Sequence, residues 1–461
     1  MQLFGRKIIY SSVSAVTVEN VVDVIRETAA DFAANRNEIS YLYKYYRGDQ
    51  PILYRNKQIR PEICNKIVEN RANEIVSFKV GYLCGEPIQY ISRSGKSTIG
   101  RNVSRLNDAM LVESKAAKDK ELAEWMHICG AGYRLILPAE RGADAPFEIF
   151  TLDPRNTYVI RSRKIGNKVL AGVYCGIDPD NSIVYSVYTP HEYFEVKDGA
   201  VITHRQMLLG GVPIIEYPLN NARLGAFEPV ISILDAINTV ASNRIDGVEQ
   251  FVQSLIKFIN CEIDKDMFAE LQALGAIQIK SLDGSNADVE IMTQELNQQQ
   301  TQTLVDYLYQ TLLTITGMPN RNGGSSTSDT GAAVQMRDGY TTANLRASDT
   351  EAMFKRSERD MLKVALAICD ASLDCDISLT LKDIDIKFTR RNYENIQTKA
   401  QVLCEMLNND KIDPKLAFIH CGMFTDSEEA YSMSMKWYED NKENPVISDG
   451  VEPPVEQTVK S

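Results

Sequence analysis

The feature that most constrains this chain is an unusually long helical pattern at residues 227–259. Nine apolar side chains recur there at steps of three or four residues, which places them on one face of an α-helix. They are Val230, Leu234, Ile237, Ala241, Ile245, Val248, Val252, Leu255 and Ile259. Pro229 suits the first turn of a helix, where no N–H is needed. Because about 30 residues make a rod of roughly 45 Å, we predict an arm that projects from the body.

An acidic insert follows this helix at residues 260–296. It holds eight acids and two bases, a net charge of −6. The acids are Glu262, Asp264, Asp266, Glu270, Asp283, Asp288, Glu290 and Glu295. A short helix at residues 264–274 fits the pattern, with strands at residues 276–280 and 288–292 around the turn Asp283-Gly284. We predict a small α/β unit with an acidic surface.

A second helix and a loop come next. Leucines at helical spacing predict a helix at residues 298–316 that stops at Gly317, with Pro319 just beyond it. The following residues, 317–330, are so rich in Gly, Ser, Asn and Thr that we predict a loop rather than a packed element. Two helices joined by a compact insert form a protruding hairpin, although a helical arm on an ordinary enzyme fits this stretch equally well.

A third long helix is predicted at residues 331–374. It contains Gly339 in its first third. Because glycine costs a helix interior roughly 1 kcal/mol relative to alanine, keeping it there indicates a bend in the helix or a close contact.

Composition narrows the classes of function. At 461 residues the chain is long enough for two to four compact units, with ordinary hydrophobic and charged content. A net charge of −12 disfavours binding around the outside of a nucleic acid, but an acidic surface can let DNA pass without sticking. Nine scattered cysteines without a C-x-x-C pair indicate reduced thiols. No signal peptide or membrane span is predicted.

The remaining pattern predicts helices flanking an antiparallel sheet domain. Helices are expected at residues 18–46, 65–81 and 115–130. Short strands punctuated by Gly, Pro, Asn and Asp are expected at residues 133–137, 147–152, 157–162, 169–175, 182–188, 191–196 and 201–204. A strand and several helices follow in residues 381–439, and residues 441–461 have the composition of a disordered tail.

For three local motifs we favour a structural interpretation over a functional one. The tyrosines of residues 41–46 lie beside bases and could stack on nucleobases, but we favour an aromatic anchor for packing. Gly95-Lys96-Ser97-Thr98 resembles part of a phosphate-binding loop, but Tyr90 stands where that loop needs its first glycine. We therefore predict a solvated turn without a clear strand, loop and helix around it. The histidines have no metal-ligand spacing and no acid/base constellation stands out, so we predict no catalytic residue, metal or cofactor.

Three runs, in order and at characteristic spacing, resemble tailed-phage portal proteins of siphophages that infect Gram-positive bacteria. They are Tyr45-Tyr46-Arg47-Gly48, then Asn65-Lys66-Ile67-Val68-Glu69-Asn70-Arg71-Ala72, then Gly81-Tyr82-Leu83-x-Gly85-x-Pro87-Ile88-x-Tyr90. Asp385-Ile386-Lys387-Phe388-Thr389-Arg390-Arg391-Asn392-Tyr393 extends the likeness towards residue 440. Asp329-Thr330-Gly331-Ala332-Ala333 departs from the Ser-Gly-x-Ala type of sequence that often opens the last long helix of such proteins.

The resemblance implies an α+β portal fold with named parts. Residues 1–226 would be N-terminal helices and a β-rich wing, 227–259 the first stem helix, 260–296 a small α/β clip and 297–316 the second stem helix. Residues 317–330 would be the tunnel loop, 331–380 a long bent helix completing the wing, 381–440 a helical crown and 441–461 a disordered tail.

The resemblance also implies a function and a site. The chain would form a ring of twelve subunits in the virion, assembled in the bacterial cytoplasm, whose channel at one capsid vertex passes double-stranded DNA during packaging and ejection. Asn320, Arg321, Asn322, Gly323, Gly324 and Ser325 would line the channel. Glu262, Asp264, Asp266, Glu270 and Asp283 would dock the terminase large subunit and later the head–tail adaptor, and Gly339 would be the helix bend.

Other implied partners are the major capsid and scaffolding proteins, and ATP hydrolysis would belong to a separate terminase. Two alternatives stay open at this point. One is an intracellular enzyme with a helical arm, nucleotide-linked through residues 95–98. The other is a non-phage scaffold or adaptor.

Overall fold

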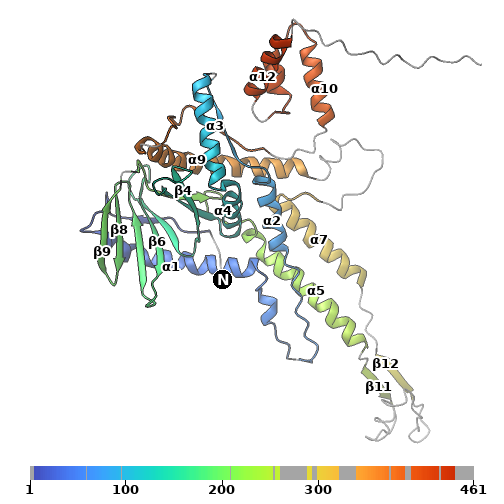
Figure 1. Cartoon of the computed structure of the whole chain (residues 1–461). Coiled ribbons are helices and arrows are strands. Elements are labelled where there is room, and N and C mark those ends of the chain that lie inside the picture. Colours follow the sequence, from blue (N-terminus) through green and yellow to red (C-terminus); the bar gives the residue numbers. More distant parts are fainter. Residues whose placement is uncertain are drawn as a thin grey trace, which may run out of the picture.

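The computed structural model consists of a mixed helix-and-sheet body, a long two-helix arm that projects from it, and a small group of helices on the opposite side (Figure 1). It describes residues 5–58, 60–94, 96–207, 209–252, 255–259, 288–292, 298–320, 339–372, 375–389, 396–424 and 427–441. Within those ranges, helices and sheets alternate in an α+β arrangement, as predicted.

A six-stranded sheet forms one side of the body. Its order is β1 (Ile9–Ser11), β5 (Thr157–Ser162), β6 (Val169–Ile177), β7 (Ile183–Tyr188), β8 (Glu192–Lys197) and β9 (Ala200–Gln206). β1 runs parallel to β5 and the other neighbours are antiparallel. Helix α1 (Val21–Tyr46) packs the apolar face that includes Val21, Ile25 and Phe32 against this sheet, and the Phe32 ring stacks on Tyr158 at 4.3 Å.

A second layer contains the largest core. Its three-stranded sheet has the order β10 (Ile214–Pro218), β3 (Ala131–Pro138) and β4 (Phe147–Leu152). The helices that contribute to this layer are α2 (Arg71–Leu83), α3 (Ser97–Val112), α4 (Lys115–Cys129) and α9 (Tyr340–Ala371). Strand β2 (Gln89–Ser92) pairs with β13 (Ile384–Lys387), whose Ile384 and Ile386 are buried in the same core. The body therefore extends past the predicted crown boundary at residue 381.

The arm is built from two helices that run side by side away from the body (Figure 1). Helix α5 (Ile231–Val252) follows the short helix η2 (Glu228–Val230) and runs outward, and α7 (Gln298–Thr316) runs back to the body. Another short helix, η1 (Pro51–Tyr54), follows α1 in the sequence. At the far end, β11 (Leu255–Ile259) pairs antiparallel with β12 (Asp288–Met292). We call α5 and α7 the stem. The separate helices are α10 (Ile396–Leu407), α11 (Pro414–His420) and α12 (Ser427–Asn441).

Several predicted boundaries agree with the structure. Strands β4, β5 and β12 and helix α7 have the predicted bounds, and the remaining predicted strands of the sheet domain are found within a few residues. Helix α7 ends where Gly317 adopts a left-handed φ of 66°, which favours glycine.

Other predictions were wrong. The first stem helix ends at Val252, because the apolar run Leu255–Ile259 forms β11 instead of a last helical turn. Residues 65–70 do not begin a helix, and α2 starts at Arg71. Ser97 and Thr98, expected in a turn, are the first residues of helix α3, which follows strand β2. Strands β1 and β10 were missed.

Candidate stem and channel site

An aromatic cluster anchors the stem to the body. The Tyr45 side chain at the end of α1 is fully buried, its ring stacks on Phe227 at 5.8 Å, and its hydroxyl donates to Asp235 Oδ1 at 2.8 Å. Burial, followed by the nearby carboxylate, raises the pKa of Tyr45, so the hydroxyl stays a donor. Tyr43 stacks on Trp125 at 5.0 Å. The predicted packing role of these tyrosines is therefore confirmed.

A segment without regular secondary structure lies along one face of α5, and we call its described residues, 55–58 and 60–69, the strap. Every second backbone N–H of its final part donates to a polar side chain one helical turn further back along α5. Asn65 N–H donates to Asp246 Oδ1 at 2.7 Å, Ile67 N–H to Ser242 Oγ at 2.9 Å and Glu69 N–H to Asn238 Oδ1 at 3.0 Å. All three acceptors are buried. We call them the polar ridge.

Further side chains bind the polar ridge at both of its ends. Asp246 accepts an ion pair from Lys57, and Arg55 Nη1 lies 3.4 Å from its Oδ2. Burial alone would raise the pKa of Asp246, but the hydrogen bonds from Lys57 and Asn65 outweigh it and hold this pKa below its ordinary value. At the other end, Asn238 Nδ2 donates to Gln50 Oε1 at 2.5 Å. The strap therefore fixes how α5 leaves the body.

The loop between α7 and α9 begins and ends at one place. The Lys79 ammonium donates to the Thr316 carbonyl at 2.8 Å, at the C-terminus of α7, where a cation is favoured. Burial, followed by Arg346, lowers the pKa of Lys79 to about 8. Gly339 has a φ of 81°, and a Cβ built on it would lie 3.7 Å from Pro319 Cα. The chain thus returns to the end of α7 before α9 starts.

The predicted channel and docking residues are only partly covered by the described residues. Asn320 is half-buried and its side chain donates to Gln310 Oε1 at 2.7 Å. The other predicted positions lie outside the described residues: Arg321, Asn322, Gly323, Gly324 and Ser325 in the loop, and Glu262, Asp264, Asp266, Glu270 and Asp283 in the acidic insert. The predicted strand at residues 276–280 lies outside them too.

The prediction places Gly339 inside a long helix, and the structure places it immediately before the first residue of α9. Its left-handed φ is one that residues other than glycine rarely adopt. The preceding part of the predicted helix, residues 331–338, lies outside the described residues, so a bend at Gly339 stays a prediction.

A buried ionic cluster holds α9 in the body. Glu358 of α9 is fully buried and accepts ion pairs from Lys115 Nζ at 2.8 Å and Arg134 Nη1 at 3.4 Å. Arg134 also binds Asp119 at 2.6 Å, and the hydroxyls of Tyr90 and Tyr217 donate to Glu358. Burial alone would raise the pKa of Glu358, but Lys115 and Arg134 hold it at about 2. The cluster carries two positive and two negative charges, so it is internally neutral.

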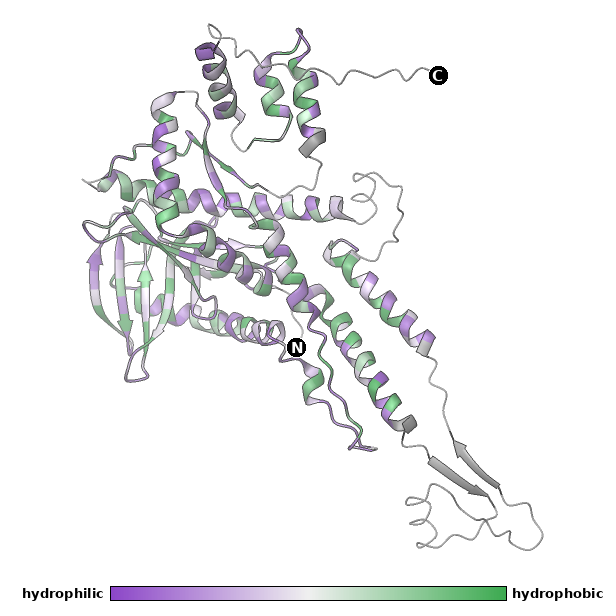
Figure 2. Ribbon diagram, turned by 45° about the vertical axis from the view of Figure 1, so that its right-hand side comes forward, coloured by the Kyte–Doolittle hydropathy of each residue, from purple (hydrophilic) through white to green (hydrophobic). Residues whose placement is uncertain are grey.

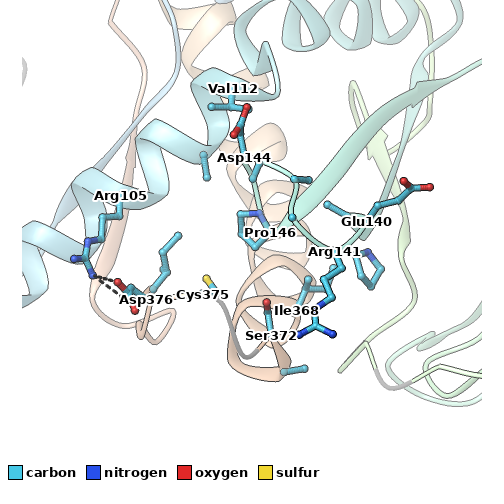
Figure 3. Close-up of a pocket in the computed structure, with 18 of the residues that line it drawn as sticks. Arg105, Val112, Glu140, Arg141, Asp144, Pro146, Ile368, Ser372, Cys375 and Asp376 are labelled. Carbon is cyan, nitrogen blue, oxygen red and sulfur yellow. Dashed lines mark hydrogen bonds and ion pairs between the residues drawn. The ribbon is translucent and has the colours of Figure 1, made fainter.

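An open cavity of about 690 Å³ lies between α3, the loop joining β3 to β4, and the C-terminal end of α9 (Figure 3). At its rim, Arg105 faces Asp376, with an ion-pair distance of 3.6 Å. Its lining mixes both signs of charge with apolar side chains such as Val112 and Ile368. We find no acid/base pair there arranged around a common point.

Two further tests apply to the described part of the chain. No group of three or more His, Cys, Asp or Glu side chains there could hold a metal ion. None of its helices combines the length and the apolar character that crossing a bilayer requires.

The strap and the polar ridge were missed by the sequence reasoning. One signal was available, because Asn238, Ser242 and Asp246 recur at steps of four beside the apolar stripe of α5. Such a buried polar row needs partners, but nothing in the sequence identifies residues 65–69, which lie about 170 residues away.

Comparisons with known proteins place the chain in a family. None of the curated proteins matches it. One chain of the solved structure titled "Virion of native gene transfer agent (GTA) particle" is 11% identical, with a TM-score of 0.48; the match covers 84% of this chain and 94% of that chain. One from "Neck of empty GTA particle computed with C6 symmetry" is 12% identical, with a TM-score of 0.46, covering 77% and 90%.

The comparison with protein families identifies the family of this chain. The family described as "Phage portal protein, SPP1 Gp6-like" matches residues 26–444, which include the six-stranded sheet except β1, the three-stranded sheet, the whole stem and helices α9 to α12. This chain belongs to that family of phage portal proteins.

Proposed function

We propose that twelve copies of this chain form a ring at one vertex of a tailed-phage or prophage capsid, and that DNA enters and leaves through its channel. Membership of the portal family makes the chain a structural virion component rather than an enzyme, and implies an oligomeric ring associated with the capsid. The nucleotide-linked enzyme is therefore excluded. We also propose that this portal is of the type found in siphophages of Gram-positive hosts and that it is assembled in the host cytoplasm.

The observation that carries the proposal is the stem. It projects from the body with apolar side chains on both helices that its own chain leaves exposed, among them Ile245, Val248, Leu304 and Tyr307. An exposed apolar surface of this extent indicates contact with other proteins. Neighbouring stems packed around an axis would bury these side chains and enclose a channel.

Charge supports passage of DNA rather than its capture. Twelve chains of net charge −12 carry 12 × −12 = −144. Because duplex DNA has one negative charge per about 1.7 Å, a basic lining would hold it in place. We propose that residues 317–330, with Asn320 and Arg321, reach the axis as a tunnel loop. The close approach of Gly339 to Pro319 supports the proposal that the residues between them form a loop.

We further propose that the acidic insert docks the terminase large subunit during packaging and the head–tail adaptor afterwards. The described strands β11 and β12 lie at the far end of the stem, where a partner outside the capsid would reach them (Figure 1). The negative residues Glu262, Asp264, Asp266, Glu270 and Asp283 would then meet basic surfaces on those partners. Capsid and scaffolding proteins would contact the body.

The test begins with the mass of the purified protein and its electron micrographs. We expect closed rings near twelve subunits with a central hole, and monomers or dimers at every concentration and salt would contradict the proposal. A non-phage scaffold or adaptor would form no such ring.

The loop is tested in variant rings of confirmed size. Arg321→Glu should lower the DNA packaged or retained per procapsid with wild-type terminase, because it places like charge beside the phosphates. The control is Lys164→Glu, a charge reversal in the exposed turn between β5 and β6 that should leave packaging unchanged. Normal packaging by Arg321→Glu would make the loop a connector only.

A further inference from the structure

We propose that, in the ring, the outer face of α7 of one subunit packs against a face of small residues on α5 of the next subunit. The inference rests on the proposed ring and identifies the surfaces that join its stems. The contact joins two copies of this chain, so these two faces are not the surface that meets DNA.

The outer face of α7 is largely exposed and carries no charge. Its residues recur at steps of one, three or four: Gln300, Thr303, Leu304, Tyr307, Thr311, Thr314 and Ile315. Leu304, Tyr307 and Ile315 are 47%, 66% and 44% exposed in the single chain. The one charged residue of the helix, Asp306, lies off this face. A surface this poor in charge and containing an aromatic residue has the composition of a protein interface core.

The complementary face of α5 is made of small side chains. It consists of Ser232, Ala236, Thr239, Asn243 and Gly247, and Val240 lies at its edge. All six are exposed or half-buried. Small side chains let another helix approach closely, and larger side chains such as Leu304 and Tyr307 can fill the resulting groove. Neither face has a charged side chain of its own. The Arg55 guanidinium reaches the α5 face, where it donates to Asn243 Oδ1 at 2.5 Å, and it lies 3.4 Å from Asp246, so its charge already has partners within the chain.

The two faces point away from the seam that α5 and α7 share within one chain. The seam contains Leu234 and Ile237 of α5 and Leu312 and Leu313 of α7, which are buried together. At about 100° per residue, the small face of α5 lies roughly 150° from its seam, and the outer face of α7 roughly 170° from its own. Two different surfaces on opposite sides of a hairpin are what a head-to-tail ring requires.

DNA is the less suitable occupant of the outer face of α7. Contacts to phosphates come mainly from Arg, Lys, polar side chains and backbone N–H groups. Three of the seven side chains on this face are apolar and none is basic, and the backbone N–H groups are used within the helix. Both stem helices carry such apolar stretches beyond the part covered by the body (Figure 2).

The first experiment is disulfide cross-linking in assembled rings. Tyr307→Cys is combined in turn with Ala236→Cys, Thr239→Cys and Gly247→Cys, in a background where Cys261 and Cys404 are serine. We expect oxidation to give a ladder of covalent multimers with at least one pair, and no ladder with any single cysteine. The control pair, Gln299→Cys with Thr239→Cys, places its first cysteine off the face and should remain uncross-linked.

Wild-type rings are prepared alongside. If wild-type protein forms no rings, the proposed function fails. If rings form but none of the three Tyr307 pairs cross-links, this inference is overturned and the proposed function stands.

The second experiment introduces a charge. Tyr307→Glu should raise the protein concentration at which half the chains are in rings by about tenfold or more, because burying an unpaired carboxylate opposes assembly. Gln299→Glu makes the same charge on the same helix off the face and should change it less than about twofold. Rings that assemble normally with Tyr307→Glu but package less DNA would show that this face meets DNA, and would overturn the inference. Far-ultraviolet circular dichroism checks that the Tyr307→Glu and Gln299→Glu variants are both folded.

Discussion

The body and the stem of this molecule both bury polar groups, but they differ in the role of their apolar side chains. Around α9 the body encloses four charged groups, Lys115, Asp119, Arg134 and Glu358, with their partners supplied by the same chain. The stem buries a polar ridge beneath the strap yet leaves apolar side chains such as Tyr307 exposed. The ionic cluster of the body is therefore satisfied within one subunit, whereas the two stem helices carry exposed apolar side chains that another molecule could cover.

The difference indicates where each part gets its stability. A buried charge is tolerated only with well-placed partners, so the ionic cluster specifies one arrangement of α4, β3 and α9. An exposed apolar residue contributes little to the stability of a single chain, but it contributes when a neighbour covers it. Four predictions test this contrast, in order of decreasing effect on the subunit.

Removing Glu358 should have the largest effect. Glu358→Ala leaves Lys115 and Arg134 with uncompensated charge in the core, and we expect the free energy of unfolding to fall by about 3–5 kcal/mol. Urea unfolding followed by near-ultraviolet circular dichroism measures it. The matched control is Glu351→Ala on the same helix, which breaks a partly exposed pair with Lys355 at 2.7 Å and should cost at most about 1 kcal/mol. Equal losses would mean that the body does not depend on its buried charges.

Acid should weaken the body through His127. This residue is buried and its Nδ1 donates to the Ala123 carbonyl at 2.7 Å; burial, followed by the charge of Lys79, lowers its pKa to about 4. A lowered histidine pKa gives stability that is fully present above pH 6.5 and lost as the pH falls towards 4, by about 3 kcal/mol.

The pH dependence of urea unfolding checks this. His127→Gln should flatten the profile between pH 6.5 and 4, while His420→Gln, at the exposed end of α11, should leave it as in the wild type. A wild-type profile in His127→Gln would assign the acid sensitivity to other groups.

Cutting one rung of the strap should have a moderate effect. Asn238→Ala removes the acceptor for Glu69 N–H and the donor to Gln50, and leaving these buried groups unpaired should cost about 1–3 kcal/mol. Proteolysis should also become faster within the strap. Thr239→Ala, one residue further along the helix and outside the polar ridge, should change stability by less than about 0.5 kcal/mol. Equal protease resistance in both variants would mean that the strap is held by other contacts.

The smallest effect on the subunit is expected at Ile245. It is 43% exposed, so Ile245→Ser should change the unfolding free energy of the single chain by at most about 0.5 kcal/mol. Ile237 lies on the same apolar stripe two turns earlier and is buried, so Ile237→Ser should cost several times more. Urea unfolding of dilute, unassembled subunits compares them. Similar losses would show that the outer stem is already covered within one chain.

The local pattern of the sequence predicted much of the fold. Strand alternation and turn residues identified the sheet domain, and Gly317 with Pro319 marked the end of α7. The same local reasoning extended the first stem helix into β11, because the spacing of Leu255 and Ile259 suits a helix, while their pairing with Met292 and Asp288 is invisible locally. Helix α3, which was not predicted, carries apolar residues at helical spacing, Val103, Leu106 and Met110, directly after the motif at residues 95–98.

The site was less predictable because its contacts join distant parts of the chain. Asn65 and Asp246 are separated by 181 residues, and Glu358 and Arg134 by 224. A buried charge looks like any surface charge in a sequence until its partner is known. The roles proposed for Arg321 and the acidic residues 262–283 stay predictions drawn from family resemblance, because these residues lie outside the described part of the chain.

Along the row of three bonds, the strap and α5 advance by nearly equal distances from one bond to the next. Four residues of α-helix advance about 6 Å, so a chain that bonds to every fourth side chain must advance about as far in two residues, close to its fully extended length of roughly 6.6–7.2 Å. The mismatch grows with each rung, which limits how many rungs can form in register. Any partial slide would break all three bonds together. The next residue one step before Asn238 on α5 is Leu234, which offers no acceptor, so the strap holds the stem in a single register relative to the body.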